Sequence, residues 1–167
     1  MANLLMVLDS LGYSREHEVR QTVRRSLDLL LTEPAGDSQY CQPCMSPIWD
    51  TGLAALAMME AGEAADGEGM QATNAWMVER QITDVAGDWA DARPDVPPGG
   101  WAFQYNNDHY PDVDDTAVVA MALHRADAEK YAEPVRLAAE WIEAMQSSNG
   151  GWGSFDAEND KYYLNHI

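Results

Sequence analysis

Identical residues recur 65 positions apart in this chain, and this spacing constrains the fold more than any other feature of the sequence. The matching pairs are Asp50-Thr51 with Asp115-Thr116, Trp76 with Trp141, and Gln81 with Gln146. Each match falls at a corresponding place in a pair of apolar-periodic segments. Internal repeats stack supersecondary units around a shared core. The sequence therefore predicts a helix pair that occurs twice.

The hydrophobic periodicity is helical throughout, and no alternating strand pattern appears between the periodic segments. We therefore expect an all-α chain. The periodicity predicts helices over 2–11, 17–31, 51–61, 69–81, 115–126 and 132–146.

Two kinds of helix can be distinguished. Helices 17–31 and 132–146 each carry one apolar stripe, formed by Val19, Val23, Leu27 and Leu30 and by Ala138, Trp141, Ile142 and Met145. Segments 52–59 and 117–123 are apolar all round, which predicts burial on every side. Half-exposed helices that alternate with buried ones indicate an inner and an outer layer, as in an α/α barrel.

A loop that contains Gly and Trp follows each repeated Gln. The first loop carries Gly87 and Trp89, and the second carries Gly151 and Trp152. Gln can satisfy backbone groups at a helix end, Gly lets a turn close tightly, and Trp supplies a large packing surface. We interpret these Gln–Trp loops as structural connections between helices.

The charge and the cysteines exclude several function classes. The formal net charge is −18, with 28 acids against 10 bases, so phosphate backbones and anionic lipid surfaces repel the chain. We therefore expect no nucleic-acid partner. No apolar run is long enough to span a membrane, and the N-terminus lacks the features of a signal peptide. Cys41 and Cys44 have no second pair to complete a zinc ribbon, so we expect structural thiols and no metal.

The segment 112–115 concentrates carboxylates at the start of an apolar helix. Asp112, Asp114 and Asp115 follow a loop rich in aromatic residues, 99–111. Asp is a preferred N-cap and first-turn residue, so capping alone explains most such clusters. Three neighbouring acids cannot all ionise cheaply, however, and burial raises a carboxyl pKa further. The helix dipole acts in the opposite direction, and the sequence leaves the balance open.

Three motifs resemble those of squalene–hopene cyclases, over nearly the whole chain. D-V-D-D-T-A at 112–117, preceded by P-G-G-W-A-F-Q-Y, is similar to the acid motif of that family. S-P-I-W-D-T-G at 46–52 looks like another of its segments. Q-S-S-N-G-G-W-G-S-F-D at 146–156 looks like its repeated Gln–Trp motif.

The resemblance implies the roles of individual residues. Asp114 would protonate the terminal alkene of squalene, and Asp112 and Asp115 would position and tune it. Trp49 and Phe103 match aromatic positions that line the cavity, where π faces stabilise carbocations without acting as bases. Phe155 falls where some members carry Tyr, so the ring is kept and a hydroxyl is lost. No cofactor or metal is implied.

The resemblance also implies a wider context. It implies an incomplete α/α barrel of the terpenoid cyclase type, part of one domain spanning 1–167 and truncated at both ends. The full enzyme would cyclise squalene to hopene or hopanol, associate peripherally with the bacterial cytoplasmic membrane through other segments, and form a homodimer. The histidine that bonds the acid would lie elsewhere, and neither His109 nor His166 is given that role. This chain alone is expected to be inactive and to expose apolar surface on helix 115–126.

Two other functions stay open. A class II diterpene cyclase shares D-x-D-D and the protonation chemistry, although the Gln–Trp loops and S-P-I-W-D-T-G favour the triterpene enzyme. A non-catalytic helical module that binds an apolar ligand is the second. Oxidosqualene cyclases show a different acid motif, metal-dependent terpene synthases need D-D-x-x-D, and protein prenyltransferases need an Asp/Cys/His zinc site.

Overall fold

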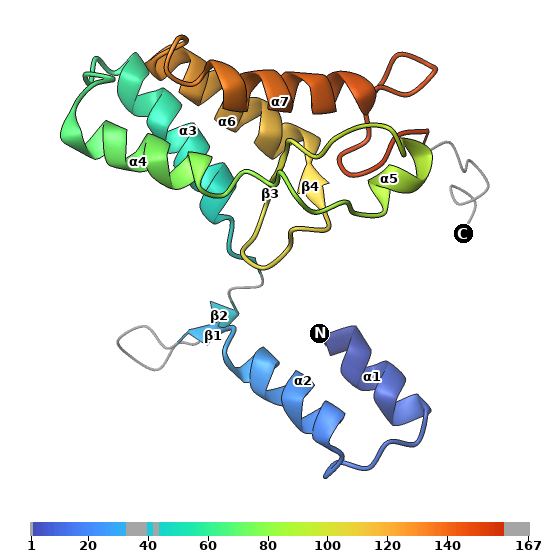
Figure 1. The fold of residues 1–167 in the computed structure, drawn as a ribbon. Helices are drawn as coiled ribbons and strands as arrows, with labels where there is room; N and C mark the ends of the chain where they lie inside the picture. The colour runs from blue at the N-terminus through green and yellow to red at the C-terminus, as the bar shows by residue number, and fades with distance from the viewer. Residues whose placement is uncertain (1, 33–39, 42–43, 159–167) are drawn as a thin grey trace. The chain divides into compact units, whose positions relative to one another are not determined.

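A computed structural model describes residues 2–32, 40–41 and 44–158 of the chain. It divides into two units, Met1–Met45 and Ser46–Ile167, each with its own packing (Figure 1). No helix among the described residues is both long and apolar enough to cross a bilayer.

The first unit pairs two helices. Helix α1 (Ala2–Ser10) packs against α2 (Glu18–Asp28), and Arg20 of α2 forms an ion pair with Asp9 at 2.7 Å. Gly12 follows α1 with φ 79°, a left-handed conformation that Gly adopts without steric cost. Val23 is buried, but Val19 is 45% exposed, so the stripe expected on this helix is only partly covered.

Both cysteines belong to this unit. Strand β1 (Leu31–Thr32) pairs antiparallel with β2 (Tyr40–Cys41), with Leu31 opposite Cys41. The side chains of Cys41 and Cys44 are exposed.

The second unit contains the two helix pairs that the repeat predicts. Helices α3 (Pro47–Glu60) and α4 (Glu68–Val78) form the first pair, and α6 (Val113–Ala126) and α7 (Ala132–Ala144) form the second. In Figure 1, α4 runs beside α3 and α7 runs along α6, and α3 packs directly on α6. A Cβ on Gly52 would lie 2.9 Å from Val118 Cγ1, so this glycine permits the close approach of α3 to α6.

Three short elements connect the two pairs. They are helix α5 (Trp89–Ala92), strand β3 (Trp101–Ala102) and strand β4 (Pro111–Asp112), with β3 and β4 antiparallel. Among the described residues every element longer than two residues is a helix, as the all-α expectation requires. The strands were not predicted, because a strand of two residues is too short to show alternation. Helix α3 also begins earlier than predicted, because Pro47 occupies its first turn with φ already fixed for a helix.

Tryptophan, methionine and aliphatic side chains fill the core of the second unit. Trp101 is fully buried, and its indole N–H donates to the carbonyl of Met77 at 2.7 Å, in the last turn of α4. Trp89 and Trp141 pack edge to face with ring centroids 5.9 Å apart. The stripe predicted on the last helix is confirmed, since Ala138, Trp141 and Met145 are fully buried.

The all-round burial predicted for two helices is wrong for the described residues. Leu53 and Met58 of α3 are 41% and 50% exposed, and Met121 of α6 is 59% exposed. Each helix packs against its neighbours with only part of its circumference. The apolar surface expected on helix 115–126 is therefore present at Met121.

The repeated glutamines make different contacts. The side-chain amide of Gln81 donates to the carbonyls of Gly99 and Pro134, both at 2.8 Å, and so joins the loop after α4 to the start of α7. Gln146 instead donates to Gly150 within its own loop at 2.8 Å. Trp152 of that loop donates to the carbonyl of Ile142 at 2.7 Å, in the last turn of α7.

Candidate active site

The acid segment lies where β4 passes directly into α6. Thr116 fixes this junction, because its hydroxyl donates to the Asp112 carbonyl at 2.6 Å and accepts the Trp101 N–H at 2.9 Å. Gly100 lies against the same junction: a Cβ there would come within 2.9 Å of Pro111 Cβ and of Thr116 Oγ1. The P-G-G-W segment is therefore held against the acid segment by hydrogen bonds and close packing.

Asp112 caps α6. Its backbone is extended (φ −111°, ψ 133°), and its Oδ1 accepts the N–H groups of Asp114 at 2.8 Å and Asp115 at 3.4 Å. Burial raises its carboxyl pKa, and the two backbone hydrogen bonds act in the opposite direction. The capping role that an isolated D-x-D-D suggests thus belongs to the first aspartate.

Asp115 is a buried carboxyl. Only 1% of it is exposed, and its Oδ1 has no hydrogen-bond partner among the described residues. Burial, and then the charges of Asp112 and Asp114, raise its pKa to about 7. The sequence left the balance of burial, neighbouring charge and helix dipole open; at this residue burial has the largest effect on the pKa.

Asp114 differs from both neighbours because its side chain is exposed. Its Oδ2 accepts the hydroxyl of Ser154 at 3.4 Å, and the Val113 N–H donates to the Ser154 carbonyl at 2.8 Å. The three aspartates of this segment therefore lie in three different environments. Asp112 caps the helix, Asp115 is buried, and the carboxyl group of Asp114 is exposed.

Asp50 is a fourth carboxylate of this site that the sequence analysis did not select. It lies in the first turn of α3 and accepts the Ser46 hydroxyl at 2.9 Å. Its charge contributes to the raised pKa of Asp115. The available signal was the repeat, in which Asp50 and Asp115 are equivalent positions. Ser154 was missed as well, because its contact with Asp114 spans 40 residues.

Each of the three aromatic candidates is adjacent in sequence to a residue or strand that is linked to the acid segment by a charge, by strand pairing or by a hydrogen bond. Trp49 is half-buried beside Asp50, and Phe103 is half-buried just after β3. Phe155 follows Ser154 and is 44% exposed. Of the histidines considered above, His109 is exposed, with Nδ1 3.5 Å from the Ala86 carbonyl oxygen, and His166 lies outside the described residues.

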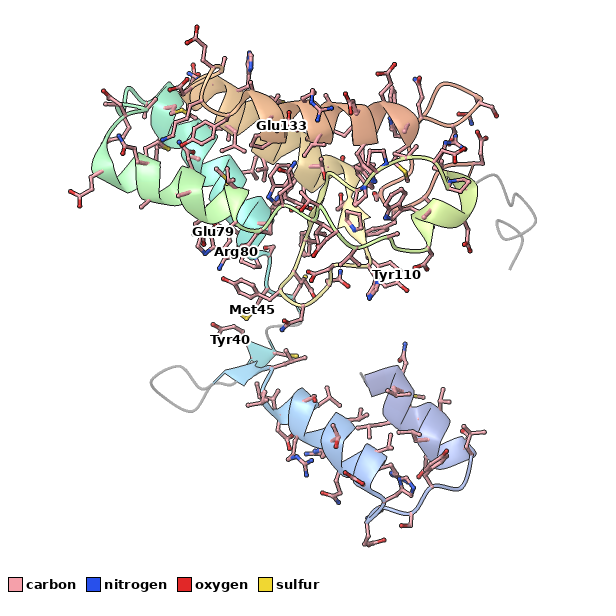
Figure 2. The ribbon with its side chains drawn as sticks, in the orientation of Figure 1. Tyr40, Met45, Glu79, Arg80, Tyr110 and Glu133 are labelled. Carbon is pink, nitrogen blue, oxygen red and sulfur yellow. The ribbon has the colours of Figure 1, made fainter. Side chains whose placement is uncertain are left out.

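A polar pocket of about 310 Å³ lies beside strand β3, and its wall includes Ile48 and Ala102, the partner of Pro111 in β4. Figure 2 labels Glu79 and Arg80 in its wall, and the Arg80 guanidinium lies 3.9 Å from the ring centroid of Trp76. The remaining wall includes Asp84, Tyr105 and Asp108. The wall of this pocket carries charged side chains, so the pocket differs from the aromatic-lined cavity that the resemblance implies. Asp50 instead borders a hollow of about 370 Å³ between α3 and α4, with Ala54, Met58 and Met70 in its wall.

The described part of the chain contains no cluster of three or more His, Cys, Asp or Glu side chains suited to a metal ion.

The comparisons of this chain with a family model and with known proteins agree on one family. Residues 45–167 match the family described as squalene-hopene cyclase C-terminal domain. A squalene–hopene cyclase of Zymomonas mobilis is 51% identical over all of this chain and 27% of its own length. One of Bradyrhizobium diazoefficiens is 48% identical over all of this chain and 26% of its own. One of Alicyclobacillus acidocaldarius is 49% identical over 75% of this chain and 20% of its own. The chain spans about a quarter of the length of the first two.

Proposed function

The chain belongs to the squalene–hopene cyclase family, and on this premise we propose that it carries the proton-donating segment of a triterpene cyclase that acts on squalene. The reaction would begin with protonation of a terminal alkene and proceed through carbocations to hopene, or to hopanol when water captures the last cation. The names of the relatives favour this function over a class II diterpene cyclase and over a non-catalytic module.

One observation carries the assignment of the acid. Because Asp112 caps α6 with its own side chain, Asp114 is not needed as the N-cap and its carboxyl is exposed. We assign Asp114 as the proton donor, with Asp112 fixing its backbone. Asp115, whose pKa is raised to about 7, would limit the negative charge beside the donor by holding its own proton near neutral pH.

The aromatic residues would stabilise the cations. We assign this role to Trp49, Phe103 and Phe155, whose π faces attract positive charge without removing a proton. Their positions beside Asp50, β3 and Ser154 support it, because each of these neighbours is linked to the acid segment. An apolar lining would keep water from ending the reaction early.

The proposed fold is a terpenoid-cyclase α/α barrel with Gln–Trp loops, in which α3 and α6 belong to the inner layer and α4 and α7 to the outer. The direct packing of α3 on α6 supports this arrangement. So does the contrast between exposed Met121 on α6 and the charged surface of α7, where Arg136 pairs with Glu133 at 2.6 Å and with Glu140 at 2.7 Å. Glu133 is labelled in Figure 2.

A protein of the relatives' full length would draw squalene from a bacterial membrane. We propose peripheral association through segments outside these residues, and a homodimer. Because this chain spans about a quarter of the relatives' length, we expect it to give no pentacyclic product from squalene by itself. Gas chromatography after incubation with squalene tests that expectation, and detectable pentacycles would contradict it.

The decisive experiment uses a chimera in which this chain replaces the matching quarter of the Zymomonas mobilis relative. In the chimera, Asp114→Asn keeps the shape of the side chain and removes its transferable proton. Turnover of squalene should fall about 10²–10⁴-fold, the range expected for loss of a general acid. The melting temperature should stay unchanged, because Asp112 supplies the cap. Near-wild-type turnover in a folded Asn variant would refute the proposal.

A further inference from the structure

The loop after α7 folds back onto the acid segment, and Ser154 is hydrogen-bonded to that segment. Ser154 contacts it twice: its carbonyl accepts the Val113 N–H at 2.8 Å, and its hydroxyl donates to Asp114 Oδ2 at 3.4 Å. We propose that Ser154 is a positioning residue for the Asp114 carboxyl group. This inference rests on the proposed function, since it matters for catalysis only if Asp114 is the proton donor.

The loop that carries Ser154 is anchored on both sides. Before it, the Trp152 indole N–H donates to the Ile142 carbonyl at 2.7 Å. After it, the Glu158 carboxylate accepts Arg93 at 3.1 Å and the Ser148 N–H at 2.9 Å. The backbone at Ser154 is therefore placed by contacts that do not involve its hydroxyl, so the hydroxyl is available to orient Asp114.

Arg93 extends this anchor to the end of α7. Its guanidinium also donates to the carbonyls of Ala144 at 2.6 Å and Gln146 at 3.0 Å. These carbonyls lie in the last turn of α7 and just after it, where the helix itself supplies no donor. The position of the loop is thus tied to the helix that packs on α6.

The contact distinguishes the two oxygens of Asp114. Ser154 occupies Oδ2, which leaves Oδ1 to carry and deliver the proton. In the transfer, the Oδ1–H bond breaks, the π electron pair of the alkene forms the new C–H bond, and the neighbouring carbon becomes the cation. The negative charge stays on the carboxylate. A hydrogen bond to a charged acceptor is stronger than one to a neutral acceptor, so Ser154 would stabilise the transition state more than the ground state.

The test compares variants of the chimera described above. Ser154→Ala should lower kcat about tenfold, which corresponds to loss of one hydrogen bond to a developing charge. KM and melting temperature should stay unchanged, because the backbone contact to Val113 remains. Ser154→Thr keeps the hydroxyl and should restore kcat. Ser10→Ala serves as the matched control, since the hydrogen bond of that hydroxyl among the described residues goes to the Met6 carbonyl within α1, at 3.0 Å.

Each other outcome has a definite meaning. If Asp114→Asn abolishes turnover but Ser154→Ala keeps wild-type kcat, the inference about Ser154 is wrong and the proposed function stands. If Ser154→Ala lowers the melting temperature and Thr fails to restore kcat, Ser154 is only structural and the inference is again overturned. If Asp114→Asn keeps its turnover, the proposed function fails first.

Discussion

The Asp112 side chain accepts the backbone N–H of Asp114 at 2.8 Å, so the first aspartate of the cluster closes the helix on which the second one is displayed. A residue that caps a helix cannot point its bonded oxygen elsewhere. The cap therefore assigns different tasks to two aspartates that are chemically identical and only two positions apart.

Replacing the cap should destabilise the chain. Asp112→Ala removes the acceptor for two N–H groups and should lower the free energy of unfolding by about 1 kcal/mol. Asp112→Asn keeps an oxygen in the same place and should stay close to the wild type. Urea unfolding of the 167-residue chain measures both, and equal stability of the Ala and Asn variants would show that the cap contributes nothing.

The buried carboxyl of Asp115 should make stability depend on pH. Its folded-state pKa, about 7, lies above the ordinary value of 3.8, so the folded state binds this proton more tightly than the unfolded state does. Stability from this group is fully present below pH 3.8 and is lost as the pH rises through about 7. In unfolding experiments across that interval, the wild type should lose more stability than Asp115→Asn.

Asp50→Asn provides the matched control for this pH dependence. The Asp50 charge is one cause of the raised pKa of Asp115, so its removal should lower that pKa and make the loss of stability smaller. Parallel curves for the wild type and Asp115→Asn would contradict the assignment of the pH dependence to this carboxyl.

The sequence predicted the major helices because their apolar residues recur with helical spacing, as Ala138, Trp141 and Met145 do. It also placed the acid cluster at a helix start. It could not say which aspartate caps, because that depends on the backbone angles of Asp112. The contact of Ser154 with Asp114 was out of reach too, since it joins residues 40 positions apart.

The prediction that two helices are buried on every side failed for a different reason. An apolar surface shows only that a helix can be covered, whereas exposure of Met121 depends on which neighbours are present around α6. Strands of two residues and the four-residue helix α5 are too short for any periodicity to detect.

Gly100 should tolerate no side chain. In Gly100→Ala, the new Cβ would meet Pro111 Cβ and Thr116 Oγ1, both at 2.9 Å, and should cost about 1–3 kcal/mol of stability. Gly69→Ala is the matched control, since no atom lies within 4 Å of a Cβ at that helical position. It should be neutral or stabilise the chain by about 0.5 kcal/mol. The midpoint of thermal unfolding should therefore be clearly lower for Gly100→Ala than for Gly69→Ala. Equal midpoints would show that the junction between β4 and α6 is not tightly packed around Gly100.

The aromatic residues should act through their π faces, which predicts a graded response in the chimera. Trp49→Phe keeps a ring in the first turn of α3 and should retain more squalene turnover than Trp49→Ala. Phe103→Ala should release partly cyclised products, because a cation that loses its stabilising ring loses a proton before the later rings close. Gas chromatography of the products separates this effect from a loss of folding, which would lower all products together. An Ala variant at position 103 with an unchanged product profile would count against a cation-facing role, and equal turnover of the Phe and Ala variants at position 49 would do the same for Trp49.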